Sequence, residues 1–181
     1  MERIISNIDF ITGSWIFYFF FVIHELEEWN IFKFEDKHFT GLPAGTTPKR
    51  SRLWILIICI TGLIWVSVAA FSADQAAAAY IFLPAIILVM LNAVQHIFWT
   101  VYFREYAPGL ISAVLLILPT GSILIANTVD NYISLWYPVI WAAAALFVLI
   151  QTIRAGKNAT PMLKIIHNIG INADKFLFKQ P

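Results

Sequence analysis

Apolar residues along this chain gather into five long runs separated by short polar segments. Each run comes close to the roughly 20 residues that a helix needs to cross the hydrocarbon core of a bilayer. The pattern predicts five transmembrane helices, over residues 8–29, 53–72, 76–103, 108–126 and 134–153. A further pattern begins at Thr160, where apolar and polar positions alternate as in a helix lying on a membrane surface. We therefore expect an all-α integral membrane protein, a single bundle of about five spans followed by an interfacial C-terminal helix.

The composition agrees with a membrane protein and limits its organisation. Hydrophobic residues make up 60% of the 181 residues and charged residues only 13%, against about a quarter charged in soluble domains. This length favours one transmembrane domain over residues 1–181, with a tail over 154–181. The net charge of +1 gives no indication of a nucleic-acid partner, so the lipid bilayer is the expected surrounding. The single cysteine, Cys59, can form no disulfide within the chain.

The distribution of basic residues predicts the orientation. In a five-span topology the loop over 30–52, the loop at Arg104 and the tail lie on one side, and they carry all but one of the 12 Lys and Arg residues. Only Arg3 falls on the other side. Because basic residues are concentrated in cytoplasmic loops, we expect the N-terminus outside and the C-terminus in the cytoplasm of a cell-membrane protein. The loop over 30–52 is expected to be an interfacial flap followed by an irregular linker.

One polar cluster interrupts the first span, in the run FYFFFVIHELEEWN. An acidic side chain costs roughly 2.5–3.5 kcal/mol near the bilayer centre and less toward its edge. His24, Glu27 and Glu28 are spaced i, i+3 and i+4, so they share one face of a helix. Because ionisable groups at this depth are costly, the cluster predicts a functional site.

A second polar pair, Asn92 and His96, lies in the third predicted span. The first and third spans run in the same direction, and His24 and His96 each lie a few residues before the end of their span. At about 1.5 Å rise per residue, both histidines lie roughly 8–10 Å inside the cytoplasmic boundary. The short loop REYAPG then returns the chain, with Tyr106, to the same side. We expect these side chains to occupy one layer.

The residue types in this layer are those of a metal site. Imidazole nitrogen and carboxylate oxygen are the usual ligands of zinc and of non-haem iron. We predict that His24, Glu28 and His96 hold a divalent metal ion, Zn or Fe, with one position open for water. Glu27 is then predicted to be the general base, or a second carboxylate that orients a histidine.

This site predicts a membrane-embedded, metal-dependent hydrolase. Its amphipathic small-molecule substrate, lipid-like or isoprenoid-like, is expected to enter from the cytoplasmic leaflet. Asn92 or Tyr106 is predicted to donate a hydrogen bond to a developing oxyanion. Two alternatives stay open, a metal-independent acid/base enzyme and a small metal- or proton-coupled transporter. Transport is disfavoured because the outer half of the bundle offers few polar residues for a pathway.

The other polar residues are expected to have no part in the site. Glu25 lies on the opposite face of its helix and is expected in the headgroup region, while His38 and His167 fall in segments expected to be solvated. Pro108 and Gly109 are expected to shape the turn and to let helices pack closely.

The polar residues also match a known pattern. The run HELEE at residues 24–28 resembles the signature of the HXXEE-motif family of small bacterial and archaeal membrane proteins. That family also has a second histidine preceded by asparagine, as in NAVQH at 92–96, and a Tyr-x-Pro-Gly element, as in YAPG at 106–109. The family has no established activity. The resemblance therefore implies a common site and leaves its chemistry to be inferred from the residues.

Overall fold

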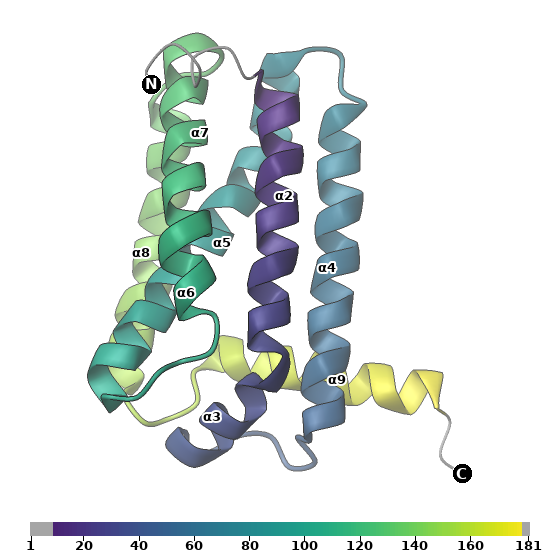
Figure 1. The fold of residues 1–181 in the computed structure, drawn as a ribbon, viewed down its shortest axis with the longest axis vertical. Helices are drawn as coiled ribbons and strands as arrows, with labels where there is room; N and C mark the ends of the chain where they lie inside the picture. The colour runs from purple at the N-terminus through teal and green to yellow at the C-terminus, as the bar shows by residue number, and fades with distance from the viewer. Residues whose placement is uncertain (1–8, 179–181) are drawn as a thin grey trace.

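The computed structural model describes residues 9–178, which form a bundle of helices (Figure 1). The long helices are α2 (Phe10–Glu27), α4 (Pro48–Ala70), α5 (Gln75–Phe103), α7 (Leu118–Asn131) and α8 (Trp136–Ala155). The short α6 (Leu110–Ser112) and the π-helical turn η2 (Ala113–Ile117) lead directly into α7. The remaining elements are the 3-10 turn η1 (Glu28–Asn30), α3 (Ile31–His38) and α9 (Pro161–Leu177). In Figure 1, α3 and α9 lie at one end of the bundle, which we call the α9 end.

The arrangement confirms the fold class expected from the sequence. Within residues 9–178, four helical segments are long and apolar enough to cross a membrane, over Pro48–Ala70, Gln75–Phe103, Leu110–Asn131 and Trp136–Ala155. The remaining predicted span, the first along the chain, corresponds to α2, which runs beside α4 through the bundle for 18 residues (Figure 1). The predicted start of that span at residue 8, together with Arg3 and Lys179, lies outside the described residues.

Side chains at the helix starts explain where the elements begin. Asp9, Asp74 and Thr160 each accept a hydrogen bond from a backbone N–H in the first turn of α2, α5 and α9, respectively. Such caps satisfy donors that have no partner within the helix. Thr47 does the same for α4, where Pro48 occupies the first turn. For this reason α4 begins before residue 53, where the apolar run had placed its start.

Two prolines within helices are accommodated without ending them. Pro119 supplies no N–H for the preceding turn and its ring crowds the carbonyl four residues earlier. The turn before it, η2, has π-helical geometry, and α7 then continues to Asn131, beyond the predicted end at residue 126. Pro84 likewise lies inside α5, which is continuous from Gln75 to Phe103.

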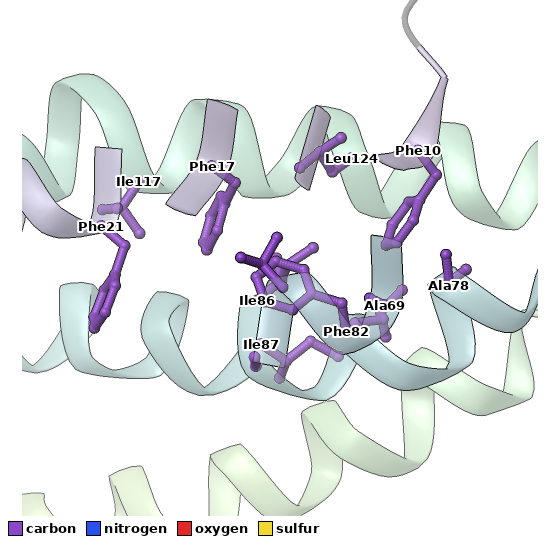
Figure 2. Close-up of a cluster of buried hydrophobic side chains, with 14 of the residues drawn as sticks. Phe10, Phe17, Phe21, Ala69, Ala78, Phe82, Ile86, Ile87, Ile117 and Leu124 are labelled. Atoms are coloured by element: carbon purple, nitrogen blue, oxygen red, sulfur yellow. The ribbon is translucent and has the colours of Figure 1, made fainter. Parts of the chain in front are cut away.

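The main core fills the space between α2, α5 and α7. Phe10, Phe17 and Phe21 project from one face of α2, opposite Ile86 of α5 and beside Leu124 of α7 (Figure 2). Other large apolar side chains point away from the bundle and are exposed, among them Phe19, Ile64, Leu115, Ile140 and Phe147. An apolar outer surface of this extent is what a bundle embedded in lipid presents.

The predicted C-terminal helix is present as α9, which crosses the α9 end of the bundle (Figure 1). It packs directly on the first turns of α4, because a Cβ added at Gly170 would lie only 2.2 Å from the Arg50 carbonyl oxygen. Asp174 forms ion pairs with Lys49 at 2.7 Å and with Arg50 at 2.9 Å. These two hydrogen-bonded cations hold the pKa of Asp174 below its usual range. The helix is therefore a part of the bundle and forms one wall of its interior.

We predict that the α9 end faces the cytoplasm, because basic residues are retained on that side. With Cys59 replaced by serine, a single cysteine at exposed Lys37 or Lys157 should react with an impermeant maleimide only from the cytoplasmic side. A cysteine at Ala73, which lies between α4 and α5 at the opposite end, should react in intact cells. The reverse pattern would contradict the orientation, and labelling of all three positions from one side would contradict the fold.

Candidate functional site

Three predicted ligands meet inside the bundle. Glu28 Oε1 lies 3.0 Å from His24 Nε2 and 2.8 Å from His96 Nε2. His24 comes from the last turn of α2, Glu28 from η1 and His96 from α5. Both imidazoles are fully buried, and Glu28 is 9% exposed. One ligand atom from each residue lies within 4.8 Å of the others, so the group has the composition and the spacing to hold a metal ion.

Glu28 Oε1 and His96 Nε2 lie close together but do not form a hydrogen bond with each other. Within the described part of the chain, neither Glu28 Oε1 nor His96 Nε2 has a hydrogen-bond partner, although the two atoms lie close together. Buried polar atoms nearly always have a partner, and the exceptions call for an explanation. A cation placed among the three residues would satisfy these atoms at once. The donor set therefore fits a divalent metal ion.

The far side of the His24 ring fixes a proton on Nδ1. His24 Nδ1 lies 2.9 Å from Ser112 Oγ, and that hydroxyl donates to Glu27 Oε2 at 2.5 Å. Because the Ser112 proton is directed at Glu27, Ser112 Oγ accepts from the His24 Nδ1–H. His24 Nε2 faces two oxygen acceptors, Glu28 Oε1 at 3.0 Å and Asn92 Oδ1 at 2.7 Å, and donates to the Asn92 oxygen. A metal ion would replace the Nε2 proton, and because Nδ1–H is held by Ser112, Nε2 is the nitrogen available for such an ion.

Glu27 is held at the start of the fourth span and does not reach the ligand atoms. Its carboxylate accepts hydrogen bonds from the backbone N–H groups of Ile111 and Ser112, from the Ser112 hydroxyl and from the Tyr106 hydroxyl. The N-terminus of a helix stabilises a negative charge placed there. A carboxylate with four donors takes up a proton only at the cost of these bonds. Of the two roles predicted for Glu27, its contacts favour the one that orients His24, acting through Ser112.

The structure separates the two predicted oxyanion donors. Asn92 lies beside the ligand atoms, where its amide contacts His24 Nε2. Tyr106 is 46% exposed and reaches the site only through its hydrogen bond to Glu27. Desolvation and the neighbouring Glu27 carboxylate raise the pKa of Tyr106 to about 12, so its hydroxyl stays protonated at neutral pH. Asn92 is therefore the nearer of the two, but the amide atom that faces the ligands is the acceptor Oδ1, so its contacts do not favour the role of oxyanion donor.

Gly109 brings the loop between α5 and α6 directly onto the site. Its φ of +98° lies in the left-handed region that glycine adopts without strain. A Cβ at this position would lie 3.0 Å from the Cε1 atoms of both His24 and His96, and 3.1 Å from Glu28 Cγ. The close packing expected of this residue is thus directed at the three ligands.

A cavity of about 230 Å³ extends from the ligand group toward α9. Its polar lining includes Glu25, Glu28 and Asn92 near the site, and Glu35 with His167 beneath α9. The last two residues form a second buried pair, with His167 Nε2 3.3 Å from Glu35 Oε2. The cavity connects the site to the helix that covers the end of the bundle.

Three expectations from the sequence were wrong at the margins of this site. Glu25 is only 7% exposed and His167 only 3%, although both were expected in solvated surroundings. His38 is also largely enclosed and contacts Glu105 at 3.1 Å. The physical reason is that α3 and α9 fold over the end of the bundle and exclude water. One available signal was the spacing of His167, which is four residues from the apolar Leu163 and Ile171 and shares their face of α9.

The comparisons with known proteins give a family and nothing further. Residues 15–124 match the family described as "Protein of unknown function with HXXEE motif". This match covers more than half of the 181 residues, so the chain belongs to that family. Every predicted site residue lies within the matched segment, whereas α9 lies outside it. No curated protein and no solved structure shows significant similarity to the chain.

Gly109→Ala should damage the ligand group more than it damages the fold. The added methyl group would press on both imidazoles, so we expect the affinity for zinc to fall by about tenfold or more, measured by competition with a chelator. Gly41→Ala is the matched control, because Gly41 also has a positive φ, of +75°, but its Cβ would meet only Lys164 at 3.8 Å. Each substitution should cost about 1 kcal/mol of stability for the left-handed backbone. Equal zinc affinity in the two variants would contradict this geometry.

Proposed function

We propose that this HXXEE-family protein is a membrane-embedded, metal-dependent hydrolase. The observation that supports it most strongly is the convergence of His24, Glu28 and His96, with buried ligand atoms that lack hydrogen-bond partners among the described residues. Two histidines and one carboxylate form a set that leaves a coordination position open, as in catalytic zinc sites. A structural zinc site usually has four protein ligands. The three-residue set therefore favours chemistry over a purely structural ion.

A bound divalent ion supplies such a site with a water whose pKa falls toward about 7 and with a Lewis acid for a carbonyl oxygen. The protein's own residues hold and orient the reacting groups. Glu27, through Ser112, holds a proton on His24 Nδ1 and so directs Nε2 toward Glu28 and the proposed ion. The Asn92 Oδ1 atom lies beside the ligand group, where it can accept a hydrogen bond from a water molecule at the open position. In this account Glu27 is a positioning residue and need not itself act as the base.

The substrate we propose is amphipathic, lipid-like or isoprenoid-like, and reaches the site from the cytoplasmic leaflet. The cavity next to the ligands supports this, because it combines polar groups at the site with apolar walls such as Ile55, Ile58 and Val89. The basic residues near the α9 end, including Lys37, Lys49 and Arg104, support a cytoplasmic location for that end.

Metal content provides the first test. The protein purified from cells supplied with zinc, iron and manganese should carry about one divalent ion per chain, measured by mass spectrometry of the elements. His24→Ala and His96→Ala should lower this content at least tenfold, because each removes a ligand from a three-ligand set. His38→Ala is the control, since His38 lies outside the group and contacts Glu105. A wild-type protein that binds no ion would leave the metal-independent acid/base enzyme as the better account.

The two carboxylates of the motif should differ in their effect on metal binding. We expect Glu28→Gln to abolish metal binding. Glu27→Gln should weaken metal binding by about 10–100-fold, as is typical of residues that orient a metal ligand without contacting the metal themselves. Ser112→Ala should resemble Glu27→Gln, because Ser112 transmits the effect. If so, the double variant should bind metal no more weakly than either single variant. Fully additive losses, or wild-type affinity in both single variants, would remove Glu27 from the site.

Turnover then separates hydrolysis from transport. Once a hydrolysed substrate is known, Glu27→Gln should keep most of its activity when enough metal is added to saturate the site, because Glu27 acts by orienting His24. A loss of about 10²–10⁴-fold at saturating metal would assign Glu27 the role of general base after all. Proteoliposomes that move the bound ion across the membrane and hydrolyse nothing would favour the transporter.

A further inference from the structure

A second group of buried polar atoms without partners lies at the far end of the cavity, beneath α9. Glu35 Oε2, both ring nitrogens of His167 and the indole Nε1 of Trp99 have no hydrogen-bond partner among the described residues. Glu35 comes from α3, His167 from α9 and Trp99 from α5, and all three line the cavity of about 230 Å³. Because buried polar atoms nearly always have a partner, these atoms indicate a bound molecule with polar groups of its own.

The chemistry of these atoms favours a headgroup with hydroxyl groups. A hydroxyl both donates and accepts a hydrogen bond, so it can donate to Glu35 Oε2 and accept from an N–H of His167 or Trp99. A quaternary ammonium can do neither and would leave these atoms unpaired. A phosphate would find no cationic partner, because the residues lining the cavity include neither lysine nor arginine. A water molecule occupies about 30 Å³ of liquid, so the cavity can hold a headgroup of several heavy atoms.

The ligand group lies between this polar end and an apolar one. Glu28 lines the same cavity, and a second cavity of about 90 Å³, lined mainly by apolar and aromatic side chains, continues between α2, α4 and α5. The two cavities share the lining residues Phe21, Ile58, Leu88 and Val89. Along α4 the lining runs from Ser51 at the α9 end to Trp65, which is roughly 21 Å of helix. Polar atoms, ligand group and apolar walls thus follow one another in the order of headgroup, ester and hydrocarbon chain in an acyl ester.

We propose that the substrate is a fatty-acid ester of a small neutral polyol such as glycerol. Its hydroxyl groups hydrogen-bond Glu35, His167 and Trp99, its ester lies at the ligand group, and its acyl chain enters the apolar cavity. In the reaction a water oxygen forms a bond to the acyl carbon, the bond from that carbon to the polyol oxygen breaks, and the polyol oxygen takes one proton of the water. One ester and one water thus give a fatty acid and the free polyol. The inference rests on the proposed function, because it names the class of substrate for the same site.

Glu35, His167 and Trp99 determine specificity in this account and take no part in breaking the bond. A site that hydrogen-bonds a substrate hydroxyl discriminates strongly against an analogue without it, because the buried groups of the protein are then left unpaired. Part of this recognition comes from α9, which the family segment of residues 15–124 does not include. The ligand group itself lies within that segment.

Hydrolysis of four esters with the same lauroyl chain tests the headgroup. The zinc-loaded, full-length protein in nanodiscs of ether-linked phosphatidylcholine, which contains no carboxylic ester, would be given monolauroylglycerol, methyl laurate, lauroylcholine or lauroylglycerol phosphate. The release of laurate would be measured. We expect kcat/KM for monolauroylglycerol to exceed that for each of the others by about 100-fold or more. Equal rates, or a faster reaction of an ester that is charged or lacks hydroxyls, would overturn the polyol headgroup while supporting the hydrolase.

A double variant tests the residues that recognise the headgroup. Glu35→Leu combined with His167→Leu replaces a buried pair by apolar side chains, a change that is often neutral for stability. It should lower the preference for monolauroylglycerol over methyl laurate at least tenfold. The matched control, His38→Leu with Glu105→Leu, removes a histidine–carboxylate contact of 3.1 Å outside the cavity lining and should preserve the preference. Trp99→Phe, which removes the indole N–H, should also lower it and decides the case if the double variant does not fold. An unchanged preference would overturn the proposal.

Binding of an ether separates this proposal from the proposed function. The ether 1-O-dodecylglycerol has no ester to cleave, and its binding would be followed by tryptophan fluorescence, since Trp54 and Trp99 line the cavity. At equal concentration in the membrane, we expect it to bind at least tenfold more tightly than dodecyl methyl ether, which has no hydroxyl. Equal binding of the two ethers would overturn the polyol site. A protein that prefers 1-O-dodecylglycerol but hydrolyses none of the four esters would instead contradict the proposed hydrolase and leave the polyol site intact.

Discussion

The burial of ionisable groups inside a bundle that faces lipid is the constraint on which this structure depends. Three glutamates and two histidines lie in or beside one interior layer, and each is costly there unless its charge is matched. Glu27 is matched by donors at the start of the fourth span, whereas Glu28 lies close to two imidazoles without a hydrogen bond to its Oε1. Glu28 Oε1 and His96 Nε2 have no hydrogen-bond partner among the described residues, and Glu25 is buried beside them. These unmet requirements are what distinguish a functional site from a set of satisfied polar residues.

The helices around this layer bring its polar side chains together and enclose them. α2 and α5 bring the two histidines to the same depth, with ring centroids 5.2 Å apart. The loop after α5 returns over them, because Gly109 permits close approach, and the following helix offers its first N–H groups to Glu27. α9 then covers the cavity and adds the buried pair of Glu35 and His167. Large parts of the rest of the bundle form an apolar surface toward lipid.

Much of this could be predicted from the sequence, because the physical signals were local. Apolar run length gave the spans, and the i, i+4 spacing placed His24 and Glu28 on one face. Equal depth in parallel spans brought His96 to them. The burial of Glu25 and His167 could not be foreseen in the same way, since it depends on α9 folding back onto α4 through contacts such as Gly170 on Arg50. The attachment of Glu27 to Ser112 likewise depends on how the fourth span begins, which apolar periodicity does not specify.

The central claim is that His24, Glu28 and His96 bind one divalent ion. X-ray absorption at the metal edge of the purified protein tests it most directly, because the spectrum reports the ligand atoms themselves. For zinc, the account predicts two imidazole nitrogens at about 2.0–2.1 Å and oxygen ligands at about 2.0–2.2 Å. It also predicts that one imidazole contribution disappears in His96→Ala. A spectrum with no imidazole, with a sulfur ligand, or unchanged by His96→Ala would contradict the account.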